Sequence, residues 1–223
     1  MGGEIMIEIL SAKESVKQIT DGSTVMVGGF LATGTPETLV DALQEQGTGK
    51  LTLVANDTSF PEKGIGKLIV SNQFEKVIVS HIGTNKYTGE KMNNGELEVD
   101  LVPQGTLAEQ VRAAGAGLGG ILTPTGIGTV AEEGKQKLTV DEKEYILAEP
   151  IEGDVALIKA EKADKNGNLV YRLSARNFNP LMAKAAKVVI AEVGEIVEPG
   201  ELDPDEVITP GVYVDYLVRR EEG

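Results

Sequence analysis

The sequence predicts an α/β protein with one open, mostly parallel sheet and helices on both of its faces. Short β-branched and apolar runs alternate with helical segments through residues 23–122, which is the order typical of a parallel sheet. Glycine-rich or polar loops follow the runs, as expected where parallel strands end at one edge. At 223 residues the chain has the length of one large domain and no evident linker, so we expect a single domain over residues 1–223.

Composition argues against several classes of function. The net charge of -14 disfavours a nucleic-acid partner, which usually needs a basic face. The chain has no cysteine and one histidine, which disfavours a thiol nucleophile and a histidine-rich metal site. No window approaches the roughly 20 apolar residues of a membrane span, and the amino terminus lacks the pattern of a secretion signal. We therefore expect a cytoplasmic protein with no bound metal, membrane or nucleic acid.

A strand, a glycine loop and a helix follow one another near the start of the chain. Residues 24–27 form a β-branched, apolar run that suits a buried strand. Gly28 and Gly29 end this run, and they let another group approach the backbone closely. Pro36 is well placed as the first residue of a helix that continues through Leu43. Such loops bind anionic ligands in many α/β proteins, although others only connect two elements.

Three further runs in this part of the chain have the length and composition of strands. A helical stretch near residues 64–71 separates the second run from the third. After the fourth run, Thr106 is expected to cap a helix, with Glu109 three residues later as its capping-box partner. We expect the four strands to be neighbours in the sheet: residues 24–27, 51–55, 77–80 and 98–102.

Polar residues follow two of these strands at the edge where ligands bind in open α/β sheets. Residues 56–59, Asn-Asp-Thr-Ser, come after the second strand. Their pattern fits a ligand site and a plain turn equally well, since Asn, Asp and Ser are turn formers. His81 follows the third strand, where a structural histidine is favoured over a functional one.

The second half of the chain is predicted to return to the sheet. The glycine run at 115–120 formally matches a dinucleotide fingerprint, but a helix precedes it, so we interpret it as a helix terminator. The loop at 123–129 either lines a site or turns the chain. The later expectations are an exposed hairpin or excursion at 131–144, a strand at 154–160 with a hairpin return at 169–171, a helix at 180–187, a core strand at 187–193 and a short strand at 212–214.

The stretch from Asp21 to Pro36 resembles the first signature of the family I coenzyme A transferases. Its pattern is Asp-Gly, two free positions, three apolar residues, Gly-Gly-Phe, three free positions, Gly, one free position and Pro. The resemblance is to the α-subunit, or to the amino-terminal half of fused single-chain members. It continues through residues 102–109, 123–126 and 174–179, and so covers nearly the whole chain.

This resemblance implies the transfer of coenzyme A from an acyl-CoA to a free carboxylic acid, such as acetate, butyrate or acetoacetate. In this family a glutamate carboxylate attacks the thioester and becomes an enzyme–CoA thioester. The family's nucleophile lies in a Ser-Glu-Asn-Gly motif of the second half, and that tetrapeptide does not occur in this sequence. The resemblance therefore implies a β-subunit that carries the glutamate, an active site at the interface and a hetero-oligomer such as a heterotetramer. CoA is expected as a thioester substrate, with no permanently bound cofactor.

The resemblance also implies site residues. Gln104 in Pro-Gln-Gly-Thr is expected to stabilise an oxyanion, although a glutamine there also suits a cap or a loop hydrogen bond. The roles of Asn56, His81 and Arg176 stay unassigned. The alternatives are a sugar-phosphate-isomerase-like enzyme, with its whole site in one chain, and a non-catalytic acyl-CoA-binding protein. The residues expected near bound CoA are Gly28, Gly29, Phe30, Leu31, Ala32, Thr33 and Gly34.

Overall fold

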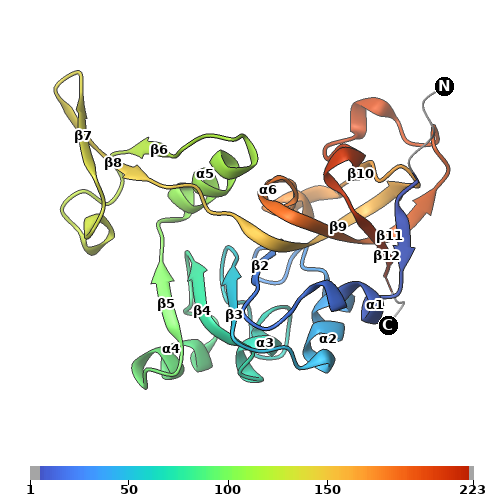
Figure 1. Ribbon diagram of the computed structural model, residues 1–223, viewed down its shortest axis with the longest axis horizontal. Helices are drawn as coiled ribbons and strands as arrows, with labels where there is room; N and C mark the ends of the chain where they lie inside the picture. The colour runs from blue at the N-terminus through green and yellow to red at the C-terminus, as the bar shows by residue number, and fades with distance from the viewer. Residues whose placement is uncertain (1–5, 221–223) are drawn as a thin grey trace.

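The computed structural model describes residues 6–220, and a nine-stranded sheet crosses this part of the chain (Figure 1). Its order is β1-β12-β11-β9-β2-β3-β4-β5, and β10 pairs with β9 outside this path. All pairs along the path are parallel, whereas β10 is antiparallel to β9. The strands are β1 Glu8–Leu10, β2 Thr24–Val27, β3 Leu51–Val54, β4 Phe74–Val79, β5 Glu98–Leu101, β9 Gly153–Asp164, β10 Leu169–Val170, β11 Ala186–Val197 and β12 Tyr216–Arg219. The predicted open, mostly parallel sheet is confirmed.

The first four predicted strands are neighbours, as expected. Val25 of β2 is in register with Leu53 of β3, which is in register with Val77 of β4. Val77 in turn lies beside Val99 of β5. Because these strands are parallel, their carboxyl ends meet at one edge of the sheet, and the loops that follow them lie there.

Helices cover both faces of the sheet, which Figure 1 shows as layers above and below it. Successive strand residues point to opposite faces, so Val25 and Val27 pack in one core while Met26 packs in the other. Buried side chains of α2 and α3 belong to the first core, and those of α5 and α6 to the second. The helices are α1 Ala12–Ser15, α2 Glu37–Gln46, α3 Gly66–Val70, α4 Lys86–Asn93, α5 Gln104–Gly115 and α6 Asn179–Ala185.

Three antiparallel strands form a second, smaller sheet that projects from the main body (Figure 1). They are β6 Ile121–Thr123, β7 Lys137–Val140 and β8 Lys143–Ala148, in the order β6-β8-β7. The predicted hairpin or excursion at 131–144 corresponds to β7 and the start of β8, whereas the pairing of β6 with β8 was not predicted. The glycine run before β6 follows helix α5, so its interpretation as a helix terminator is confirmed.

The predicted strand at 212–214 is wrong. Residues 211–213 form a 3₁₀ turn, and the last strand is β12, four residues beyond the predicted start. Pro210 and Gly211 open this turn and bend the chain, so the β-branched residues there form no strand. The short 3₁₀ segments are η1 Val16–Gln18, η2 Val130–Glu132, η3 Leu173–Arg176, η4 Pro204–Glu206 and η5 Gly211–Tyr213. Within residues 6–220, every helix is too short or too polar to cross a membrane.

Candidate active site

The glycine loop closes into a tight hairpin at residues 30–33, which we call the first hairpin. The Phe30 N–H donates to the Thr33 carbonyl at 3.0 Å, and the Thr33 N–H donates back at 2.9 Å. The two residues at its tip, Leu31 and Ala32, both have positive φ, at 45° and 67°. A two-residue turn of this kind normally takes Asn-Gly or Gly-Gly, because side chains disfavour the left-handed region. The tip is therefore strained.

The close approach predicted at the glycines is made by the protein's own side chains. A Cβ added at Gly28 would lie 1.8 Å from Oδ1 of Asn179, and one at Gly29 would lie 2.3 Å from Oγ1 of Thr35. Both glycines are buried, whereas Phe30 and Thr33 of the first hairpin are exposed. The glycines thus pack the base of the loop, the tip residues Leu31 and Ala32 are half-buried, and Phe30 and Thr33 face outward.

Two asparagines hold the loop from the side of β9 and α6. Asn177 accepts from the Gly29 N–H at 3.1 Å and donates to the Thr33 carbonyl at 2.9 Å. Asn179 is fully buried and donates to the Gly34 carbonyl at 3.0 Å. Both belong to the stretch 174–179 that carried part of the family resemblance. The sequence assigned them no role, because nothing local indicates that they bind a loop 145 residues away.

A polar network connects the hairpin tip to Gln104. Asp57 accepts from the Leu31 N–H at 2.9 Å and from the Asn56 side-chain amide at 2.7 Å. Asn56 in turn accepts from Nε2 of Gln104 at 2.7 Å. The 56–59 loop is therefore more than a plain turn, because two of its side chains join parts of the predicted site that are distant in the sequence.

Gln104 is the first residue of α5, and its side chain is exposed. The predicted cap at Thr106 is wrong: Pro103 precedes the helix, and no side chain caps the helix start. Glu109 instead pairs with Arg112 on the helix surface at 2.6 Å. The fixed φ of proline suits a helix entrance, and the cap position lies at Pro103, three residues upstream of the predicted cap. The free N–H groups and the positive end of the helix dipole thus lie beside Gln104.

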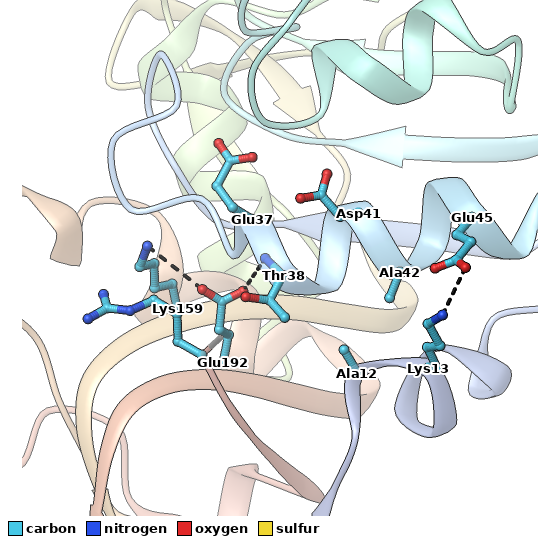
Figure 2. Close-up of a pocket in the computed structure, with 10 residues that line it drawn as sticks. Ala12, Lys13, Glu37, Thr38, Asp41, Ala42, Glu45, Lys159 and Glu192 are labelled. Carbon is cyan, nitrogen blue, oxygen red and sulfur yellow. Dashed lines mark hydrogen bonds and ion pairs between the residues drawn. The ribbon is translucent and has the colours of Figure 1, made fainter. Parts of the chain in front are cut away.

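The helix start that follows the glycine loop is different, because the protein's own carboxylate occupies it. Glu192 of β11 accepts from the Thr38 N–H at 2.8 Å (Figure 2). It also accepts from the Leu39 N–H at 3.3 Å. Burial raises the pKa of Glu192, against the lowering effects of Lys159 and of these two N–H groups. The two N–H groups at this helix start are therefore already paired with a side chain of the protein itself.

A hollow of about 470 Å³ lies beside Glu192. Figure 2 shows Lys159 on one side of the glutamate and the acidic side chains of α2 along another wall. The Lys159 ammonium is 3.8 Å from Glu192, and Lys13 pairs with Glu45 at 2.8 Å. Charges of both signs line this hollow, so its walls do not select one kind of ion.

Other predicted residues are brought near the site without a visible role. The His81 carbonyl accepts from the Thr58 N–H at 3.2 Å, while its ring is exposed. This fits the structural histidine favoured from the sequence. Arg176 is exposed and lies one residue before Asn177. The loop at 123–129 lies on the small sheet. Among residues 6–220, no cluster of three or more His, Cys, Asp or Glu is arranged to hold a metal ion.

Comparison with known proteins identifies the family. The family model described as coenzyme A transferase matches residues 9–220. Acetate CoA-transferase subunit alpha of Escherichia coli K12 is 54% identical, over 96% of this chain and 98% of that protein. The acetoacetyl-CoA:acetate/butyrate CoA transferase alpha subunit of Clostridium acetobutylicum is 50% identical, over 89% of this chain and 91% of that protein.

A solved structure agrees with these matches. An acyl-CoA transferase from Escherichia coli O157:H7, solved as a thioester complex with CoA, superposes with a TM-score of 0.86 at 25% identity. The match covers 96% of this chain and 47% of the other, so this chain spans about half of that transferase. The sequence and the fold together show that the chain belongs to the coenzyme A transferase family, in which it is an α-subunit.

Proposed function

We propose that this α-subunit acts with a β-subunit to move coenzyme A from an acyl-CoA to a short-chain or 3-oxo carboxylic acid. The observation that carries the proposal is the 54% identity, over nearly the whole chain, to an acetate CoA-transferase subunit. A second relative is named for acetoacetyl-CoA, acetate and butyrate. The isomerase and non-catalytic alternatives are not favoured, because both relatives are CoA-transferase subunits.

The chemistry requires a carboxylate nucleophile. Attack of a glutamate carboxylate on the acyl-CoA carbonyl breaks the C–S bond and gives an acid anhydride and CoA thiolate. The thiolate then attacks the glutamyl carbonyl, which releases the first acid and leaves an enzyme–CoA thioester. The second acid reverses these two steps. Each attack places negative charge on a carbonyl oxygen, so the site needs hydrogen-bond donors aimed at that oxygen.

This chain supplies a donor of that kind. One N–H of the Gln104 amide is bonded to Asn56, and the same nitrogen carries a second N–H that is directed elsewhere. It projects from a helix start without a side-chain cap, whose dipole also favours negative charge. We assign to Gln104 the stabilisation of the oxyanion, and to the first hairpin the positioning of the thioester. The exposed Phe30 and Thr33 of this hairpin, rather than its buried glycines, face the substrate.

The partner supplies the glutamate in this proposal. The sequence lacks the family's Ser-Glu-Asn-Gly motif, and the relatives are named as subunits of larger enzymes. Gln104 and the first hairpin then face the β-subunit across an interface, within an assembly that contains both kinds of chain. Obligate interfaces of this kind are usually large and apolar.

The test is to purify this chain with and without its β-subunit, and to mix each preparation with acetyl-CoA and butyrate or acetoacetate. New acyl-CoA is measured by mass. We expect transfer by the complex and none by either chain alone. Full transfer by the isolated α-subunit would contradict the proposal.

A further inference from the structure

We propose that Asn56 and Asp57 are positioning residues that fix the direction in which Gln104 donates its hydrogen bonds. The inference rests on the proposed function, because it concerns the same site. Both residues directly follow β3, and they are 2% and 3% exposed. Burial of polar groups of this kind costs free energy unless they are hydrogen-bonded. Here each hydrogen bond fixes which atom of the next side chain acts as the donor.

Asp57 sets this direction. It accepts from the Ser59 N–H at 2.7 Å, the Leu31 N–H at 2.9 Å and the Asn56 amide at 2.7 Å. All three partners are donors, as a carboxylate requires, since it has no hydrogen to donate. Asn56 must therefore turn its NH₂ group toward Asp57 and its oxygen away from it.

The oxygen of Asn56 then sets Gln104. It accepts from Nε2 of Gln104 at 2.7 Å and from the Ser80 hydroxyl at 3.3 Å. If the Asn56 amide were rotated by half a turn, its NH₂ group would face Gln104. The Gln104 side chain would then have to accept this hydrogen bond with its oxygen. The site would then lose its donor, because the Gln104 NH₂ group would point elsewhere. A charge at Asp57 thus determines the orientation of an exposed amide two hydrogen bonds away.

The same carboxylate holds the first hairpin. Its bond to the Leu31 N–H is made at the strained tip, where both residues have positive φ. A strained conformation persists only when its surroundings enforce it. Asp57 therefore fixes both the donor and the loop, so that the two face the substrate in one geometry.

The experiment is a double-mutant cycle on the assembled αβ complex, with acetyl-CoA and butyrate as substrates. Gln104→Ala is expected to lower kcat by about 100- to 1,000-fold, as for loss of one oxyanion donor. Asn56→Ala is expected to lower kcat by about 10- to 100-fold through misplacement of that donor, with the KM for acetyl-CoA unchanged. In the Gln104→Ala background, Asn56→Ala should have little further effect, since Gln104 is the group through which it acts.

Two further variants keep the test decisive. Asp57→Asn is close to isosteric and preserves the packing, but an amide can also donate, so the direction is no longer fixed. It should lower kcat even where Asn56→Ala does not fold. Asn85→Ala is the control: Asn85 is 1% exposed and donates to the Thr58 carbonyl at 3.2 Å, without contact to Gln104. It should destabilise the chain without a selective loss of kcat.

The outcomes separate the two proposals. The positioning role would be overturned if the fold-loss in kcat of the double variant equalled the product of the losses of Asn56→Ala and Gln104→Ala, because the two residues would then act independently. Wild-type kcat for Asp57→Asn would overturn it as well. Wild-type kcat for Gln104→Ala would instead contradict the oxyanion assignment in the proposed function.

Discussion

Two neighbouring strands end in hairpins of the same design, and only one of them has positive φ at its tip. The first hairpin follows β2, and the second, residues 60–63, follows β3. Each is followed by a glycine at positive φ, Gly34 at 78° and Gly64 at 54°, and each leads into a helix. The first tip is Leu31-Ala32 with positive φ at both residues, whereas the second is Pro61-Glu62 with positive φ at neither.

The difference shows that positive φ at the hairpin tip is not needed to connect a strand to a helix in this fold, while Ser59, directly before the second hairpin, has a φ of 54°. Proline fixes φ in the negative range, so the second hairpin is relaxed. It is held by the Glu37 carboxylate, which accepts from the Gly64 N–H 27 residues away, and by the Thr84 hydroxyl, which donates to the Ser59 carbonyl 25 residues away. The first hairpin is held by Asp57, which is 26 residues from Leu31, and in addition by Asn177, which is 144 residues from Thr33. Strain that is enforced in this way is typical of functional sites.

The largest expected effect comes from the glycine after each hairpin. At Gly34 a new Cβ would lie 2.5 Å from the backbone carbonyl oxygen of Ala175, while at Gly64 it would lie 3.0 Å from the Ser59 hydroxyl, which can rotate. Gly34→Ala should therefore lower transfer by the αβ complex about 100-fold, as misplacement of reacting groups does. Gly64→Ala, which also has positive φ, is the matched control and should keep most of the activity. Equal losses in the two variants would remove the distinction between the hairpins.

The strain itself is tested by relaxing it. The double variant Leu31→Asn, Ala32→Gly gives the first tip the sequence that a type I′ turn prefers. We expect it to raise the free energy of unfolding by about 1–2 kcal/mol and to lower transfer about 10-fold, because a relaxed tip is less rigidly placed. Thermal melts and kcat are measured on the same preparation. The corresponding change in the second hairpin, Pro61→Asn with Glu62→Gly, should lower stability and leave transfer nearly unchanged.

A smaller effect is expected from Glu192, whose carboxylate accepts from the N–H groups at the start of α2. Burial raises the pKa of Glu192 above its ordinary 4.5, so the folded state binds this proton more tightly than the unfolded state. The resulting stabilisation is present at acid pH and is lost as pH rises through the raised pKa. Glu192→Gln removes this dependence. The Tm of the wild type minus that of the variant should therefore fall as pH rises above about 4.5, and a flat difference would contradict the burial argument.

Much of the fold could be predicted from the sequence, because its main signals are local. The runs at 24–27 and 51–55 are apolar and β-branched, and they became adjacent parallel strands. The start of α5 was misplaced, because a Ser/Thr-x-x-Glu pattern at 106–109 looks like a capping box, while Pro103 had already set the entrance. A proline next to a helix is a weaker sequence signal than a complete box.

The candidate site was predicted less completely. The glycine loop and Gln104 were named through the family resemblance, and their direct contact with CoA stays a prediction. The roles of Asn177, Asn179 and Glu192 required the structure, because each acts on residues more than 140 positions away. Spacing in the sequence carries no information on such contacts when only one sequence is considered. For the same reason, the order of hydrogen-bond donors and acceptors from Asp57 to Gln104 could not be predicted from the sequence.

The central claim is that this chain contributes the oxyanion donor and the loop, while its partner contributes the nucleophile. The most direct measurement is to load the αβ complex with acetyl-CoA, reduce it with borohydride and map the modified residue by peptide mass spectrometry. Borohydride reduces an enzyme–CoA thioester, so it marks the glutamate that carried CoA. We predict one reduced glutamate in the β-subunit and an unmodified α-subunit. A reduced glutamate within this chain would contradict the account.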